Sequence, residues 1–410
     1  MEIPIKLGIE VFFEKYLNLL KGKKVGLITN PTGVDSNLES TIGLFFKSVK
    51  TDLVALFAPE HGIKGDHQAG EHIPFYVDQH YNLPVFSLYD QSIKTNLALL
   101  DLDARMRSFD TLESGKSLKE DILRTMDAIV LDLQDIGCRT YTYVATMAYC
   151  IKTCARSNLE FIVLDRPNPI NGQIMEGPVL DYPTYSSFIG IYPIPIRHSM
   201  TIGELAMLFN ERFQNEQDKK VNLSVIPMEG WKRSMWFDDT RLPWVMTSPN
   251  MPTIESTTVY PGQVLLEGTN VSEGRGTTRP FEIFGAPWID SYKLSRRLNK
   301  LKMAGIRFKE MYFRPTFSKY TGELCHGAQI YVLDRDKYKP FETTLTIIET
   351  LLDMYPANFE FFGEYFDKVI GNGQLRSHLE NGNNIDSIRN SYQKELDNFS
   401  LLKEEFMLYE

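Results

Sequence analysis

The sequence predicts an α/β protein: a Rossmann-like domain with a mainly parallel sheet, followed by a smaller α+β domain. Short apolar runs rich in β-branched residues recur in the first part of the chain, and helical patterns lie between several of them. The runs lack polar–apolar alternation, which is typical of strands buried on both faces of a parallel sheet. The composition changes near residue 250. We therefore expect one domain at residues 1–250 and a second at 255–410.

Five segments have the composition of such buried strands. In chain order they are KVGLIT (24–29), LVALFA (53–58), PVFSLY (84–89), AIVLDL (128–133) and FIVLD (161–165). Strands that alternate with helices are typical of βα units in a parallel sheet.

Helices are expected between and after these strands. Ser36 with Glu39, and Thr201 with Glu204, have the spacing of a capping box, and an apolar face follows each pair. A third apolar face runs through residues 144–155. These patterns complete the first domain.

The second domain begins after a stretch rich in proline, glycine and threonine. Residues 240–290 contain SPNMPTIESTTVYPGQ and EGTNVSEGRGTTRPF, which are typical of long functional loops. A strand is expected at 328–333 (AQIYVL) and a helix over PFETTLTIIETLLDMY, before a charged helical tail. This mixture predicts an α+β domain.

The composition excludes several function classes. With a net charge of −9 and a pI near 5.5, the chain is a poor partner for nucleic acid or an anionic membrane. Its apolar runs are too short to span a bilayer. The N-terminus lacks a basic stretch followed by an apolar one, so no signal peptide is expected in the chain as numbered, and the cytoplasm is the compartment that the sequence alone indicates. The four cysteines lack metal-finger spacing and are expected to be reduced, packed thiols.

Polar residues gather where the predicted strands end. Ligands of open parallel sheets bind beyond the carboxyl ends of the strands. The loops TNPTG, PEHG, DLQDIGCRTYTY and DRPNPINGQIMEGP follow four of the strands. We expect them to bring one group of side chains into a single crevice: Asn30, Glu60, His61, Asp135, Arg139, Tyr141, Tyr143, Asp165, Arg166, Asn168 and Glu176.

Familiar catalytic motifs are missing. The chain contains no G-x-x-x-x-G-K-[ST] loop, no G-x-G-x-x-G after the first strand and no G-x-S-x-G elbow. No nucleotide cofactor and no acyl-transfer serine are therefore expected. The remaining chemistry is that of paired carboxylates with arginines and aromatic rings, which suits a glycosidase.

Several long motifs resemble a known family. GLITNPTGV, LFAPEHGIKGDHQAGE, VLDLQDIGCRTYTYVATM, VLDRPNPINGQIMEGPVLD, PIRHSMTIGELA and LLEGTNVSEGRGTTRPFEIFGAPWID are similar to the NamZ-type exo-β-N-acetylmuramidases, formerly a domain of unknown function. The resemblance runs in order from about residue 6 to the C-terminus. It implies release of N-acetylmuramic acid from the non-reducing ends of peptidoglycan fragments, either muramic-acid disaccharides or muropeptides. Such enzymes are often exported, although no leader is visible here.

The resemblance also implies an active cleft at the junction of the two domains, and it implies site residues. Glu60 of PEHG becomes the first catalytic candidate, and Asp135 is our choice for a second carboxylate, with Glu176 and Glu267 as rivals. Arg139, Arg166 and Arg275 are candidates to bind the lactyl carboxylate of muramic acid. The full set expected to bind substrate is Asn30, His61, Arg139, Tyr143, Asp165, Arg166, Asn168, Glu176, His198, Glu267, Asn270, Glu273 and Arg275. No metal or other cofactor is expected.

Two other functions stay open. A metal-dependent hydrolase could use the cluster of Glu60, His61, Asp66 and His67, although its spacing matches no helical metal motif. A non-catalytic protein that binds muropeptides could use the same scaffold. Chelation and product formation would separate these functions from a glycosidase.

Overall fold

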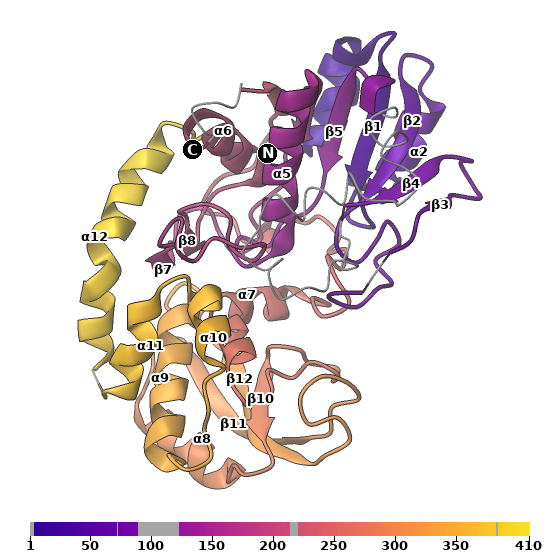
Figure 1. The fold of residues 1–410 in the computed structure, drawn as a ribbon. Coiled ribbons are helices and arrows are strands. Elements are labelled where there is room, and N and C mark those ends of the chain that lie inside the picture. The colour runs from indigo at the N-terminus through magenta and orange to yellow at the C-terminus, as the bar shows by residue number, and fades with distance from the viewer. Residues whose placement is uncertain (1–3, 72, 89–122, 214–219, 383) are drawn as a thin grey trace.

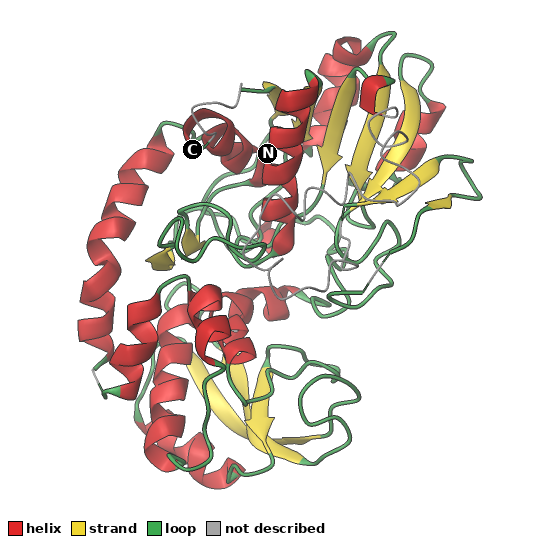
Figure 2. Ribbon diagram, in the orientation of Figure 1, coloured by secondary structure: helices red, strands yellow, loops and turns green. Residues whose placement is uncertain are grey.

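The computed structural model describes residues 4–71, 73–88, 123–213, 220–382 and 384–410. Figures 1 and 2 show two parts, one built around a larger sheet and one around a smaller sheet. One feature expected from the sequence extends beyond the described residues, namely the last residue of the expected strand 84–89.

The larger sheet confirms the Rossmann-like prediction. It has seven strands in the order β3-β4-β2-β1-β5-β6-β9. Only β3 runs antiparallel to its neighbour β4; the other neighbours are parallel. The strands are β1 (Lys24–Thr29), β2 (Asp52–Ala58), β3 (Tyr76–Val77), β4 (Pro84–Ser87), β5 (Ala128–Asp132), β6 (Glu160–Leu164) and β9 (Asn222–Ile226).

The apolar runs located the central strands to within one residue at each end. Every residue of β5 is buried, as are all but the first residue of β1, because helices cover both faces of the sheet. Strand β9 was not expected, since its residues are mostly half-exposed and follow no continuous apolar run.

The helices of this part are partly as expected. Thr201 and Glu204 form the predicted capping box of α6. The prediction of a capping box at Ser36 and Glu39 is wrong, because α2 begins after Ser40. The Ser36 hydroxyl instead donates a hydrogen bond to Glu10. The helical elements are α1 (Gly8–Val11), η1 (Phe12–Tyr16), η2 (Leu17–Leu20), α2 (Thr41–Lys47), α5 (Thr142–Ser157), α6 (Ile202–Arg212) and η4 (Phe237–Thr240).

The second part is α+β, as expected. Its antiparallel sheet has the order β10-β12-β11, and the segment expected at 328–333 belongs to β12. Its elements are α7 (Ile254–Gln263), η5 (Val264–Gly268), β10 (Ile283–Ala286), α8 (Ser291–Lys300), β11 (Ile306–Phe313), β12 (Cys325–Val332), α9 (Pro340–Met354), α10 (Gly363–Ile370), α11 (Gly373–Glu380) and α12 (Ile385–Glu404). A two-stranded hairpin of β7 (Glu176–Val179) and β8 (Pro195–Arg197) belongs to the first part of the chain.

The end of the chain returns to the larger sheet. Helix α12 packs against β7, and the C-terminus lies beside α6 (Figure 1). The domain boundaries at 250 and 255 stay a prediction. All four cysteines are free and buried, and no helix in the described ranges has the length and apolar character needed to cross a bilayer.

Candidate active site

Four loops leave one edge of the larger sheet. Strands β1, β2, β5 and β6 are parallel, so the loops that follow them start from the same side. The prediction that residues 60, 135 and 165 lie at one edge is therefore confirmed. Of these three side chains, however, only that of Glu60 lines the cleft described below.

A cleft of about 560 Å³ lies between this edge and the smaller part of the chain. Residues from both parts line it, as expected for a cleft at their junction. Those that carry charge or an aromatic ring are Glu60, His61, Tyr141, Phe188, Tyr260, Glu267, Arg275, Phe281, Glu364, Tyr365 and Lys368.

Glu60 is fixed at the tip of the loop after β2. Its side chain is buried, with Oε1 accepting a hydrogen bond from the Gly70 N–H at 3.1 Å and Oε2 accepting one from the Thr142 hydroxyl at 2.6 Å. Thr142 is the first residue of α5. The backbone turns sharply after Glu60, because His61 and Gly62 both have positive φ angles of 74° and 82°. This turn directs the carboxylate into the cleft.

His61 lines the same wall. Its Nδ1 lies 2.9 Å from the carbonyl oxygen of His67, an acceptor, so Nδ1 carries the hydrogen. Burial lowers the pKa of His61 below its ordinary 6.5, although the carboxylate of Glu60 opposes the shift. The ring is therefore neutral at neutral pH and leaves Nε2 as an acceptor.

The four residues of the metal hypothesis do not converge. His67 Nδ1 pairs with Asp66 Oδ1 at 3.0 Å, while His61 Nδ1 bonds the backbone carbonyl of His67. Within the described ranges, no three His, Cys, Asp or Glu side chains lie close enough together to hold a metal ion. The geometry therefore gives the metal-dependent hydrolase no ligand set among these residues.

The wall formed by the smaller part of the chain carries a second carboxylate, Glu267. Arg275 Nη2 donates to Glu267 Oε1 at 2.6 Å, and the Tyr365 hydroxyl donates to Oε2 at 3.2 Å. The guanidinium of Arg275 lies 5.0 Å from the centre of the Phe281 ring. Burial opposes its charge, but the carboxylates of Glu267 and Glu273 raise the pKa of Arg275 above its ordinary value.

Two neighbouring predicted residues support this wall from behind. The buried carboxylate of Glu273 accepts from Lys319 Nζ at 3.0 Å, and Lys319 also donates to two backbone carbonyls. Asn270 bridges the backbone of Asn358 and Glu360. Neither Glu273 nor Asn270 lines the cleft, so both hold the loop rather than reach its surface.

Asp135 is not the second carboxylate of this cleft. Its side chain turns back to accept a hydrogen bond from the Gly137 N–H at 2.7 Å, and it lies 3.4 Å from His198 Nε2. The other ring nitrogen of His198 accepts from the Met200 N–H. Asp135 and His198 are both buried away from the cleft lining, which corrects the expectation from the sequence.

Two of the three expected arginines are also structural. Arg139 is fully buried and donates to four backbone carbonyls, including those of Val369 and Ile370 at the end of α10. Burial lowers its pKa to about 10. Arg166 forms a buried ion pair with Asp132, with Nη2 2.8 Å from Oδ2. Neither can reach a substrate carboxylate without leaving these partners.

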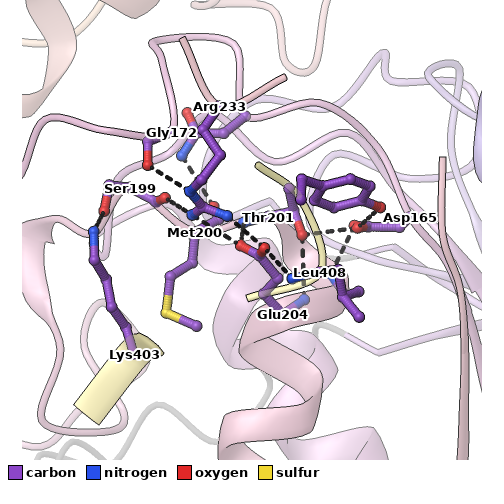
Figure 3. A network of polar contacts seen from close by, with 12 residues as sticks. Asp165, Gly172, Ser199, Met200, Thr201, Glu204, Arg233, Lys403 and Leu408 are labelled. Atoms are coloured by element: carbon purple, nitrogen blue, oxygen red, sulfur yellow. Dashed lines mark hydrogen bonds and ion pairs between the residues drawn. The ribbon is translucent and has the colours of Figure 1, made fainter. Parts of the chain in front are cut away.

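Asp165 belongs to a buried network rather than to the cleft (Figure 3). It accepts hydrogen bonds from the Thr201 hydroxyl, the Gly203 N–H and the hydroxyl of Tyr409 near the C-terminus. Burial raises the pKa of Asp165 to about 7. Its acceptor groups fix the start of α6 and the end of the chain.

Glu176 and Asn168 hold other parts of the fold together. Glu176 pairs with Arg197 at 3.0 Å and accepts from the Phe341 N–H in the first turn of α9, and burial raises its pKa to about 7. Asn168 donates to the Met200 carbonyl and accepts from the Ile170 N–H. Neither lines the cleft.

Asn30 and Tyr143 lie behind the cleft wall. The Asn30 amide donates to the Tyr143 hydroxyl at 2.7 Å, and that hydroxyl donates to the Thr247 carbonyl. Tyr141, two residues earlier, does line the cleft. Of the residues expected to act on substrate, the structure thus brings together Glu60, His61, Glu267 and Arg275.

Sequence reasoning missed the residues that α7 and α10 supply. Tyr260, Glu364, Tyr365 and Lys368 line the cleft, and Thr142 holds Glu60. The only signal for the α10 residues is the spacing in GEYFDKVI, which places Glu364 and Lys368 one turn apart. That spacing is common on any helix surface.

A Rossmann-like scaffold whose cleft is lined by three carboxylates and several aromatic rings defines a protein of the glycosidase class. Comparison with known proteins agrees. The chain belongs to the NamZ family of exo-β-N-acetylmuramidases: residues 25–255 match the model of its N-terminal domain, and residues 258–409 match that of its C-terminal domain.

Similar proteins cover the whole chain. The peptidoglycan β-N-acetylmuramidase NamZ of Bacillus subtilis is 46% identical over 406 residues, which is 99% of this chain and 91% of that protein. Two crystal structures of DUF1343 family proteins from Bacteroides fragilis share the fold. One is 35% identical with a TM-score of 0.86 and full coverage of both chains. The other is 27% identical with a TM-score of 0.73, covering 100% of this chain and 99% of that one.

Proposed function

We propose that Glu60 and Glu267 are the two carboxylates of the glycosidase reaction. The chain is an exo-acting glycoside hydrolase that releases N-acetylmuramic acid from the non-reducing ends of peptidoglycan fragments. The observation that carries the assignment is the cleft itself, which Glu60 lines from the larger part of the chain and Glu267 from the smaller part. Glu267 takes the role expected for Asp135, which does not line the cleft.

Glu60 is the general acid in this proposal. It donates a proton to the glycosidic oxygen while the bond to the anomeric carbon breaks, and the departing sugar leaves as an alcohol. The Thr142 hydroxyl and the Gly70 N–H keep its carboxyl group in one orientation. A fixed orientation is valuable because proton transfer requires hydrogen-bond distance to the leaving oxygen.

Glu267 stabilises the positive charge that develops at the anomeric carbon. Arg275 and Tyr365 hold its two oxygens in place. A carboxylate at this position can act as a nucleophile, as a base for an attacking water, or as a group that orients the substrate's own N-acetyl oxygen. The carboxylate separation in a substrate complex decides between them: about 5 Å suits retention and about 6.5–9.5 Å suits inversion.

The substrates are muramic-acid disaccharides or muropeptides. The aromatic rings of Tyr141, Tyr260 and Phe281 give the cleft apolar faces for a sugar ring. Its volume of about 560 Å³ suits a small ligand rather than a long glycan strand.

A pair of chromogenic substrates tests the proposal. The 4-nitrophenyl glycosides of N-acetylmuramic acid and N-acetylglucosamine are compared, with and without a chelator. We expect kcat/KM to favour the muramic glycoside by about 100-fold or more, since a cleft built for an anionic substituent is left with an unpaired charge by the other sugar. Activity should survive chelation. Binding of the sugar without any product would contradict the proposal.

A further inference from the structure

The cleft contains two cationic side chains, and their environments differ. The guanidinium of Arg275 is occupied by Glu267 at 2.6 Å and lies 3.4 Å from Glu273. Lys368 on α10 is half-buried and lines the same cleft. In the part of the chain that the structure describes, no carboxylate forms an ion pair with it, not even Glu364 one turn earlier on α10. Lys368 is thus the cation in the cleft that an anionic ligand can pair with at no cost to an existing ion pair.

The position of Lys368 is fixed by its neighbours on α10. Tyr365, three residues earlier and on the same helix face, donates its hydroxyl to Glu267. Just after Lys368, the carbonyls of Val369 and Ile370 accept hydrogen bonds from the buried Arg139. The helix face that carries Lys368 is therefore held beside the second carboxylate.

The chemistry of the substrate matches this cation. N-acetylmuramic acid differs from N-acetylglucosamine by a lactyl ether that ends in a carboxylate. A half-buried ammonium without a counter-ion gains more from such a carboxylate than an exposed lysine does, because little water screens the pair. Arg139 and Arg166, expected from the sequence for this task, are buried among other partners.

We propose that Lys368 binds the lactyl carboxylate of N-acetylmuramic acid and so sets the preference of the enzyme for muramic over glucosamine glycosides. This role rests on the proposed function of the cleft. Lys368 is a specificity residue and not a proton donor, so its loss should raise KM far more than it lowers kcat.

The test uses Lys368→Met, which keeps the length and apolar stem of the side chain, and Lys368→Arg, which keeps the charge. Three 4-nitrophenyl glycosides are compared: that of N-acetylmuramic acid, its lactyl amide and that of N-acetylglucosamine. Lys394→Met, a change at an exposed lysine on α12, is the matched control.

We expect Lys368→Met to lower kcat/KM about 10- to 100-fold on the muramic glycoside, mostly through KM, and to leave the other two substrates within about 2-fold. Lys368→Arg should restore most of the loss, and Lys394→Met should change nothing. An equal loss on all three substrates, or no loss on the muramic glycoside, would overturn the inference.

A direct binding measurement tests the inference without any need for turnover. Free N-acetylmuramic acid is titrated calorimetrically into the wild type and into Lys368→Met. A Kd that is about 10-fold weaker for the variant supports the inference, and equal Kd values refute it. Failure of the wild type to hydrolyse any muramic glycoside would instead count against the proposed function.

Discussion

At the scale of single residues, the PEHG turn places a carboxylate in the cleft. An apolar strand delivers Glu60 to its tip, and the positive φ angles of His61 and Gly62 turn the chain away so that the carboxylate faces the cleft. The hydroxyl of Thr142 then binds one of its oxygens at 2.6 Å. Thr142 acts on the reaction only through Glu60, which makes it a positioning residue.

Replacing Thr142 should therefore weaken catalysis without weakening the fold. We expect Thr142→Val to lower kcat about 10-fold on a natural disaccharide, because Glu60 loses one of its two hydrogen-bond donors. KM should change little. Thr146→Val is the control, since Thr146 lies one turn further along α5 and bonds only the Thr142 carbonyl. Equal losses of kcat in both variants would contradict this role of Thr142, because they would show that any such change in α5 disturbs the site.

The candidate site was only partly predictable at this scale. The sequence made Glu60 the first catalytic candidate, because a carboxylate at a strand tip between Pro59 and Gly62 has few structural reasons to be there. It could not separate Glu60 from Asp135 or Asp165, since all three follow parallel strands. All three side chains are buried, and what separates them is that only Glu60 lines the cleft. Loops packed between two parts of a protein must satisfy their own backbone groups, and most of their polar side chains serve that need.

At the scale of elements, the buried strands were the most predictable part. Their continuous apolar runs have few alternative environments, whereas β9 and the start of α2 depend on contacts that no local pattern contains. The same holds for α10, whose cleft-facing residues look like an ordinary helix surface. The sequence thus predicts the strands of the larger sheet better than it predicts the helices that line the cleft.

The residues from the end of α12 to the C-terminus make buried contacts that the sequence did not predict (Figure 3). Lys403 Nζ donates to Ser199 Oγ at 2.6 Å, and the Leu408 N–H donates to Glu204, which also pairs with the buried Arg233. Tyr409 reaches Asp165. These contacts tie the last residues of the chain to the loop before α6.

The buried Lys403 should make stability depend on pH. Burial, reinforced by the charge of Arg233, lowers the pKa of Lys403 from 10.5 to about 8. The unfolded chain then binds more protons than the folded chain between these values, so stability rises as pH rises from about 8 to 10.5, and the same amount is lost as pH falls from 10.5 to about 8. This contribution amounts to about 2–3 kcal/mol.

Urea unfolding at pH 7 and pH 10 measures the effect. Relative to Lys403→Met, the wild type should gain about 2–3 kcal/mol in the free energy of unfolding between the two pH values. Lys394→Met, which removes an exposed lysine of the same helix, should follow the wild type. A Lys403→Met protein with the pH dependence of the wild type would mean that Lys403 is not desolvated in the folded state.

At the scale of the whole molecule, the reaction depends on both parts of the chain. Glu60 comes from the larger sheet and Glu267 from η5, so neither part contains the cleft alone. Arg139 and Glu176, expected to bind substrate, instead hold α10 and α9 against the first part. Residues that the sequence assigned to the substrate thus build the junction that brings the proposed catalytic pair, Glu60 and Glu267, into one cleft.

The most direct test of this account is the turnover of Glu60→Gln on a natural muramic-acid disaccharide. The amide keeps the shape and an acceptor for the Gly70 N–H, but it has no proton to donate to the glycosidic oxygen. We expect kcat to fall by about 100-fold or more with unchanged thermal unfolding, and much of the rate to return with a 4-nitrophenol leaving group, which needs little protonation. Near-normal turnover of the disaccharide by Glu60→Gln would contradict the account, because Glu60 would then be only a residue of the turn.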